Sequence, residues 1–310
     1  MGPAPPSLFP APCRAASSLA SGAMDETPYD GPGRAAGGTA GGAPGALDGL
    51  ADLRVERREA GVALVTLDLP QRRNSMSEAM TESWGRVMAA LRADRGIRAV
   101  VVTGEGSAFC AGGDLSWIGA EPGAPVDRLR ERMLPFYRTW LSVRDLEVPT
   151  IAAVNGAAIG AGMALALACD LRYAAEDSRL GMPFTALGMH PGMASTFLVP
   201  EVAGLAVARE MLLTGRIVSG AEAASMGLVN RSLPPADVLA HALSVADTVA
   251  AAAPVATRLT KAALSVGGPV TFDAALQWEA LAQPVTLATE DLQEGLAAQR
   301  EKRRPRFTGR

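Results

Sequence analysis

The stretch PTIAAVNGAAIGAGMALALACD, residues 149–170, constrains the fold more than any other part of the chain. It opens with the apolar run Ile151–Val154, which indicates a buried strand. Small residues follow at 160–162, and then Met163–Ala168, whose composition suits a helix packed on all sides. The first turn of such a helix leaves backbone N–H groups without partners and can receive a developing oxyanion. A tight strand–helix turn that serves only close packing is the alternative.

A second apolar run that ends in a glycine-rich loop lies about fifty residues earlier. Residues Ala99–Cys110 indicate another buried strand and loop, and Ala111-Gly112-Gly113-Asp114-Leu115 follows directly. Two turns of this kind can supply two N–H donors to one carbonyl oxygen.

Together, FCAGGDL and NGAAIGAGMALALACD resemble the two motifs of the enoyl-CoA hydratase/isomerase (crotonase) superfamily. The resemblance extends over roughly residues 52–270, through LVTLDLPQRRNSMS and LLTGRIVSGAEAASMGLVN. It implies an α/β fold, a crotonase-like spiral of ββα units, with a C-terminal helical oligomerisation region. It also implies an acyl-CoA substrate and a homotrimer or hexamer. The expected organisation is a tail at 1–50, an acyl-CoA-binding core at 51–252 and a helical region at 253–310.

Composition excludes several other classes of function. The formal net charge of −3 gives no electrostatic case for nucleic acid as a partner. No apolar run reaches membrane-spanning length, so no membrane is expected as a partner. The three cysteines form no disulfide or metal pattern, which fits a reducing, cytoplasmic location. No metal site and no separate cofactor are expected, because coenzyme A belongs to the substrate.

Residues 1–50 are rich in Ala, Gly and Pro and predict a disordered tail, in which Met24 is an alternative start. Leu53–Arg57 and 61–67 then predict a β-hairpin. Ser75, with a glutamate three residues later, has the form of a capping box that opens a helix.

Later segments predict mainly helices. Residues 128–143 form an amphipathic pattern, and the segment 184–192 reads as a loop that crosses the site. Ser219 and Glu222 form a second capping box. The remaining predicted helices are 236–252, 254–266 and a helical region at 272–300.

The resemblance assigns the oxyanion donors by motif position. They are the backbone amides of Gly113 and Ala161, and an alanine at the second position keeps its N–H. Ala111 and Asp114 flank the glycine pair and are assigned to substrate binding. Asp114 is also interpreted as a structural cap or loop anchor rather than a catalyst.

The acid/base groups depart from the family pattern. The two glutamate positions of the hydratases hold Ala164 and Phe184, which are assigned to substrate binding, and a third acidic position holds Gly192. His190 is the titratable side chain of the loop and can act as acid or base. A loop histidine bonded to backbone is the alternative. Carboxylates at 121, 127 and 131 could reach inward only if their helix folds over the site.

Binding of coenzyme A is assigned by resemblance to four residues. Arg72 and Arg73 lie in the loop expected to line the adenine and phosphate groove, and guanidinium groups suit phosphate. Lys261 and Phe272 belong to the region that closes the nucleotide site. Simple solvated side chains are the alternative for these positions.

The sequence therefore predicts a lyase or isomerase of the enoyl-CoA hydratase/isomerase type that binds an acyl-CoA thioester and stabilises its enolate. Hydration or isomerisation through another base stays open, as do decarboxylation and thioester hydrolysis. A non-catalytic acyl-CoA-binding protein is the alternative from another class.

Overall fold

The computed structural model describes residues 47–265, 268 and 270–310. Most of the predicted tail, residues 1–46, lies outside the described residues. Leu47 and Leu50 fall within the predicted tail but are partly buried against the main core. The packed region therefore begins a few residues earlier than predicted, because these two leucines have apolar surface to bury.

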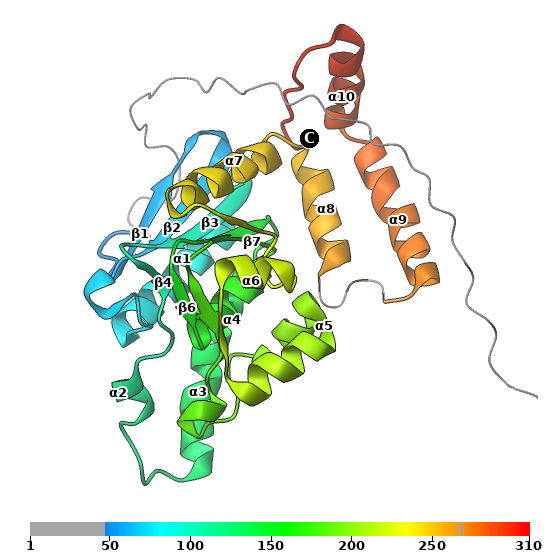
Figure 1. Ribbon diagram of the computed structural model, residues 1–310. Helices are drawn as coiled ribbons and strands as arrows, with labels where there is room; N and C mark the ends of the chain where they lie inside the picture. The colour runs from blue at the N-terminus through cyan, green and yellow to red at the C-terminus, as the bar shows by residue number, and fades with distance from the viewer. Residues whose placement is uncertain (1–46, 266–267, 269) are drawn as a thin grey trace, which may run out of the picture. The chain divides into compact units, whose positions relative to one another are not determined.

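A six-stranded sheet forms the centre of the fold (Figure 1). The predicted hairpin is confirmed, since its two strands pair antiparallel, and the other neighbouring strands pair in parallel. Every residue of the second, third and fourth strands in the sheet order is buried, as expected for a parallel sheet covered on both faces. In order across the sheet, the strands are β1 (Leu53–Arg57), β2 (Val62–Leu67), β3 (Ala99–Gly104), β5 (Thr150–Val154), β7 (Leu171–Ala175) and β10 (Arg231–Leu233).

A second, four-stranded sheet carries the small-residue turns. Its order is β4 (Ala108–Cys110), β6 (Ala157–Ile159), β8 (Arg179–Gly181) and β9 (Ile217–Ser219). Three successive strand pairs, β3–β4, β5–β6 and β7–β8, each place one strand in either sheet, and helices follow each pair. This arrangement confirms the predicted ββα repeat.

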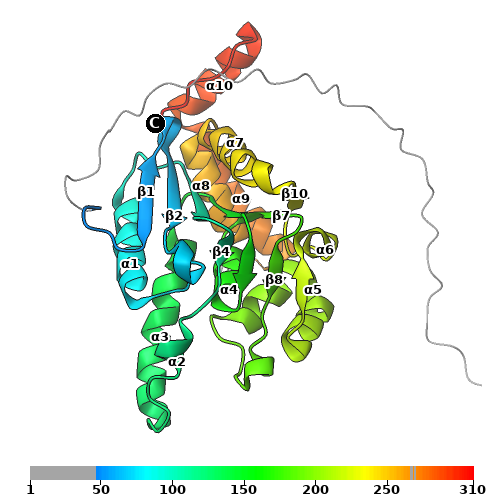
Figure 2. The ribbon, with the colours of Figure 1, turned by 60° about the vertical axis from the view of Figure 1, so that its left-hand side comes forward.

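Helices α1 (Glu78–Ala93), α4 (Ala161–Ala168) and α7 (Val238–Ala250) lie against the strands of the two sheets (Figures 1 and 2). Helix α7 packs over β3 and β5 and closes a small core on one face of the large sheet. Helices α1, α3 and α4 contribute to the larger core, in which Trp84 stacks on Trp140 with ring centroids 4.9 Å apart. The helices that precede the C-terminal region are α1 (Glu78–Ala93), α2 (Leu115–Ile118), α3 (Val126–Leu141), α4 (Ala161–Ala168), α5 (Ser195–Thr214), α6 (Gly220–Ser225) and α7 (Val238–Ala250).

The C-terminal region is helical, as predicted. It consists of α8 (Pro254–Leu264), α9 (Phe272–Leu287) and α10 (Glu290–Glu301), and α8 lies beside α9 (Figure 1). No single helix in the described part of the chain is long and apolar enough to cross a membrane. One pair of consecutive helices, Pro235–Ala250 and Pro254–Leu264, is long and apolar enough only when the two are taken together, and the pair is bent by 112° at the break between them.

One predicted helix start is wrong. The Ser75 capping box does not form, because the chain is still extended at Met76, which bridges to Gly113. Ser77 caps α1 instead, and its hydroxyl accepts from the Met80 amide. At the second box Ser219 caps α6 as predicted, and the Glu222 carboxylate pairs with Arg216 rather than returning to the cap.

Candidate active site

The two small-residue turns meet because their strands are neighbours. Strands β4 and β6 pair in parallel, and each runs directly into one of the turns. A Cβ built at Gly112 would lie 2.6 Å from the Ile159 carbonyl oxygen and 3.4 Å from the Ala161 nitrogen. Gly112 also has a φ of +100°. Only glycine permits both this conformation and this approach, so Gly112 brings the second turn against the first.

The amides assigned to the oxyanion hole are free of protein partners. Around them the backbone is paired: Gly160 N donates to Gly181 O at 2.8 Å, and Ala111 N donates to Arg73 O at 2.9 Å. Within the described chain, neither the Gly113 nor the Ala161 N–H donates a hydrogen bond. Ala161 is the first residue of α4, where helix geometry leaves the amide unpaired.

Both residues line one cavity of about 100 Å³. The predicted site residues that share it are Ala111, Gly113, Ala161, Phe184 and His190. These five residues come from three segments, namely the turn after β4, the first residue of α4 and the segment between β8 and α5, which all meet at the same apolar space. Its other lining residues are Gly112, Leu115, Trp117, Ile118, Met133, Phe136, Tyr137, Ile159, Gly160, Pro183, Leu187, Met189, Gly192 and Met193.

The positions that lack glutamate behave differently from one another. Phe184 lines the cavity, and its ring would lie 3.6 Å from a Cβ built at Gly160. Ala164 is fully buried in the core and does not line the cavity, because its side chain ends at a methyl group one helical turn beyond Gly160. At one of the two glutamate positions the cavity therefore has an aromatic wall, Phe184. At the other, Ala164 only packs in the core.

His190 and Tyr137 are the titratable side chains among the described lining residues of this cavity. The exposed His190 imidazole has Nδ1 2.9 Å from the carbonyl oxygen of Pro191. Tyr137 comes from α3, which was predicted from sequence as an amphipathic helix without this tyrosine being singled out as a site residue. A hydroxyl-bearing aromatic on the apolar face of that helix is the signal that could have identified it. Burial raises the pKa of Tyr137, so its proton stays on the hydroxyl at neutral pH.

Asp114 is a cap and an anchor, as interpreted from sequence. Its carboxylate accepts from the Ser116 amide at 3.0 Å and hydroxyl at 2.7 Å, and so caps α2. It also pairs with Arg72 at 2.7 Å. The hydrogen bond from the Ser116 hydroxyl is the largest contribution that lowers the pKa of Asp114. Neither Arg72 nor the exposed Arg73 lines the cavity, and the Arg73 carbonyl instead holds the Ala111 amide.

The two C-terminal residues assigned to coenzyme A lie away from the amides. Lys261 pairs with Asp170 and donates to the Val148 carbonyl, both at 2.8 Å, and its side chain is 9% exposed. It lines a separate, larger cavity of about 1200 Å³. Phe272 is 78% exposed at the start of α9. A role for either residue in nucleotide binding stays a prediction.

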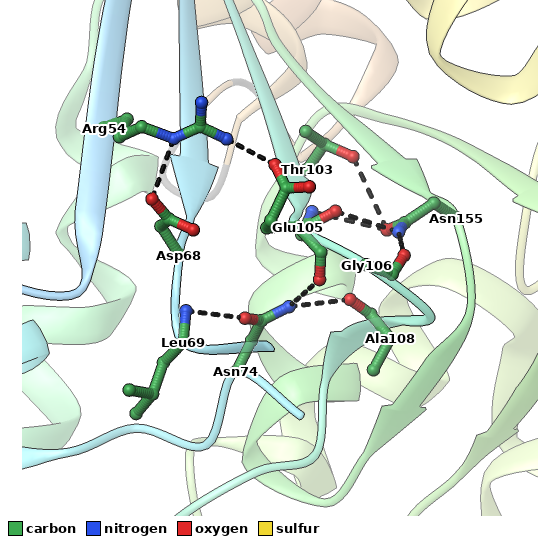
Figure 3. A network of polar contacts seen from close by, with 10 residues as sticks. Arg54, Asp68, Leu69, Asn74, Thr103, Glu105, Gly106, Ala108 and Asn155 are labelled. Carbon is green, nitrogen blue, oxygen red and sulfur yellow. Dashed lines mark hydrogen bonds and ion pairs between the residues drawn. The ribbon is translucent and has the colours of Figure 1, made fainter. Parts of the chain in front are cut away.

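A polar network anchors the loop before the first turn (Figure 3). The fully buried Asn74 amide accepts from Leu69 N at 2.9 Å and donates to the carbonyls of Glu105 at 2.9 Å and Ala108 at 2.8 Å. Asn155 holds the same loop from the other side, since its amide donates to the carbonyls of Gly104 and Gly106, both at 2.9 Å.

This network fixes the start of β4 relative to β6, and hence one oxyanion donor relative to the other. Among the described residues, no cluster of three or more His, Cys, Asp or Glu could hold a metal ion.

Comparisons with known proteins agree with this geometry. The family model for enoyl-CoA hydratase/isomerase matches residues 57–310. A Thermus thermophilus protein named as an enoyl-CoA hydratase candidate is 40% identical over 253 residues, which are 82% of this chain and 100% of that protein. The human enoyl-CoA hydratase domain-containing protein 2, mitochondrial, is 35% identical over 261 residues, 81% of this chain and 87% of that protein.

Solved structures share the fold. The enoyl-CoA hydratase from Bacillus anthracis is similar with a TM-score of 0.79 and 35% identity, covering 84% of this chain and 100% of that one. The enoyl-CoA hydratase from Polaromonas sp. JS666 gives a TM-score of 0.77 and 30% identity, over 83% and 99% of the two chains. With its two mixed sheets, its paired small-residue turns and these matches, the chain belongs to the enoyl-CoA hydratase/isomerase (crotonase) superfamily.

Proposed function

We propose that this protein is an acyl-CoA enzyme that stabilises a thioester enolate through the amides of Gly113 and Ala161. The observation that carries the proposal is that both amides belong to one cavity and lack partners in the described chain. A preorganised donor of this kind is typically worth about 3–4 kcal/mol at the transition state. The reaction is then of the hydratase or isomerase type that the family membership implies.

The cavity favours a short acyl group. An apolar cavity of about 150 Å³ accepts a benzene molecule, so a space of about 100 Å³ suits roughly four carbons. Phe184 narrows this space, and we expect Phe184→Ala to shift the preference among acyl-CoA esters toward longer chains. Comparing kcat/KM for four-carbon and eight-carbon enoyl-CoA esters tests the expectation, and an unchanged ratio contradicts it.

A matched pair of variants tests the oxyanion hole directly. Gly113→Ala keeps the N–H, and the added methyl meets only the flexible end of Ile118 at 3.2 Å. Gly113→Pro removes the N–H. We expect the proline variant to lose about 100-fold to 1000-fold in kcat relative to the alanine variant. Circular dichroism checks that both are folded, and equal kcat values in the two folded variants would refute the proposal.

A second candidate reaction is decarboxylation of a malonyl-type CoA ester. It is favoured by the lining of the cavity, in which the described residues include no carboxylate. Loss of CO2 generates the enolate without removal of a proton by a base, whereas hydration requires a group that activates water. Thioester hydrolysis also depends mainly on an oxyanion hole.

A panel of crotonyl-, 3-enoyl- and malonyl-CoA esters, followed by spectroscopy, separates these reactions. Turnover of the malonyl ester alone favours decarboxylation, and release of free coenzyme A favours hydrolysis. Tight binding without turnover of any ester supports the non-catalytic acyl-CoA-binding alternative. His190→Gln in the same panel tests whether the imidazole carries a proton, and unchanged kcat would remove it from the mechanism.

We also propose that the chain forms a homotrimer or hexamer and works in the cytoplasm. Exposed apolar side chains on α9, including Leu281 and Val285, support a partner surface in this region. Sedimentation velocity measures the oligomer. A monomer at micromolar concentration would contradict the proposed assembly. For coenzyme A we expect Arg73→Ala to raise KM without changing kcat, and an unchanged KM would exclude a phosphate contact.

A further inference from the structure

The Tyr137 hydroxyl occupies space that a side chain at position 192 would need. A Cβ built on Gly192 would lie 2.5 Å from the Tyr137 hydroxyl oxygen and 3.1 Å from the ring carbon that bears it. All three of the nearest atoms belong to the Tyr137 side chain, so a side chain at position 192 would force the tyrosine ring to move. Position 192 is also one of the three at which the family resemblance expects an acidic group, and here it is glycine. The phenol of Tyr137 therefore stands where that acidic group is absent.

The hydroxyl is free to interact with a ligand. Tyr137 lines the cavity that holds Gly113 and Ala161, and its hydroxyl forms no hydrogen bond within the described part of the chain. The ring is half-buried and lies beside Phe136, with ring centroids 6.2 Å apart. A half-buried hydroxyl without a protein partner is costly unless water or a bound molecule satisfies it.

Tyr137 also lines the larger cavity of about 1200 Å³. Among the described lining residues, Tyr137 is the one that the apolar cavity at the oxyanion amides shares with this second space. Arg138, Asp145 and Lys261 give the second space charged walls. A phenol in this position can exchange its proton with water on one side while it faces a substrate on the other. The burial that raises the pKa of Tyr137 keeps the hydroxyl protonated, which suits a donor rather than a base.

We propose that Tyr137 is the proton donor of the site and that its hydroxyl protonates the α-carbon of the acyl-CoA enolate held by the Gly113 and Ala161 amides. This role rests on the proposed function. In the step, the phenolic O–H bond breaks and a C–H bond forms at the α-carbon. The enolate supplies the electron pair of the new bond and becomes the neutral thioester. The phenolate then takes a proton from water in the larger cavity, so the hydroxyl is restored.

The test compares Tyr137→Phe with Tyr173→Phe, which makes the same chemical change at a tyrosine that does not line this cavity. Tyr173 is on β7 and packs against His241, with ring centroids 4.5 Å apart. The assay uses whichever ester of the crotonyl-, 3-enoyl- and malonyl-CoA panel the wild-type protein turns over fastest. We expect Tyr137→Phe to lower kcat by about 100-fold or more. Acyl-CoA dissociation constants should stay within about threefold, and Tyr173→Phe should match the wild type.

Two further readouts distinguish proton donation from a structural role. In D2O, the wild type should place deuterium on one face of a prochiral α-carbon, and the residual product of Tyr137→Phe should carry it on both faces. The second readout is Gly192→Ala, whose methyl displaces the hydroxyl. It should lower kcat strongly in the wild type but cause a much smaller further loss in Tyr137→Phe, because the hydroxyl that it displaces is already gone and only the ring carbon 3.1 Å away remains close.

The outcomes separate this inference from the proposed function. Tyr137→Phe with wild-type kcat and single-face labelling overturns the donor role and leaves the oxyanion hole intact. Binding of acyl-CoA by the wild type without turnover of any ester also overturns the donor role. Absence of acyl-CoA binding by the folded wild type overturns the proposed function, and the donor role falls with it.

Discussion

Replacing Asn74 by alanine tests how strongly the polar network holds the site together (Figure 3). The side chain is fully buried and makes three hydrogen bonds to backbone groups. Alanine leaves the Leu69 amide and the Ala108 carbonyl buried without a partner, at about 1–3 kcal/mol each. Asn74 also has a φ of +54°, a conformation that costs alanine about 1 kcal/mol or more.

These contributions sum to a loss of about 3–7 kcal/mol in the free energy of unfolding. That is a large fraction of the roughly 5–15 kcal/mol that stabilises a typical folded protein. Urea unfolding followed by circular dichroism measures the loss, read at a constant m-value. Activity should fall as well, because the anchored loop leads directly into β4 and the turn that carries Gly113.

Asn230→Ala is the matched control. Asn230 is exposed, and its side chain accepts one hydrogen bond, from the Arg172 amide at 2.8 Å. We expect this variant to lose only about 0.5–1.5 kcal/mol. If Asn74→Ala loses no more free energy of unfolding than Asn230→Ala does, the network does not hold the first turn in place.

Four further predictions concern stability and reactivity. Gly162→Ala should lower the free energy of unfolding by at least about 2 kcal/mol in urea, because the new Cβ would lie 2.1 Å from the Cys110 carbonyl oxygen; an unchanged midpoint contradicts this close approach. Burial raises the pKa of Cys110 and of Cys169 to about 12. In a variant whose third cysteine, Cys13, is replaced by serine, we therefore expect neither thiol to react with Ellman's reagent at pH 8 until urea unfolds the chain. For the same reason stability should fall as pH rises from 9 toward 12, since the unfolded chain releases these protons first, and a flat profile would refute the assignment. Lys261→Met should cost about 1–2 kcal/mol and speed proteolysis within α8, because it removes the pair with Asp170 at 2.8 Å; unchanged cleavage there would show that α8 is held by other contacts.

Local patterns predicted much of the fold from sequence. Apolar runs such as Ile151–Val154 became buried strands, because a parallel sheet covered on both faces requires continuous apolar side chains. Helix positions were also predicted, although α3 runs over Val126–Leu141 rather than 128–143 and α8 ends at Leu264. Helix ends depend on which hydroxyl reaches the first free amides, and Ser77 outcompeted Ser75 once the bridge at Met76 had extended the chain.

The sequence by itself determined the two turns, because only small residues allow a backbone to approach as closely as Gly112 approaches Ile159. It also determined that carboxylates are absent at positions 164 and 184. Only the tertiary structure decided which groups share the cavity. It brought Tyr137, on a helix between the two motifs, against Gly192, and it paired Arg72 with Asp114 and Lys261 with Asp170. The physical reason is that a motif fixes local backbone geometry, whereas the partner of an isolated polar side chain depends on how distant elements pack.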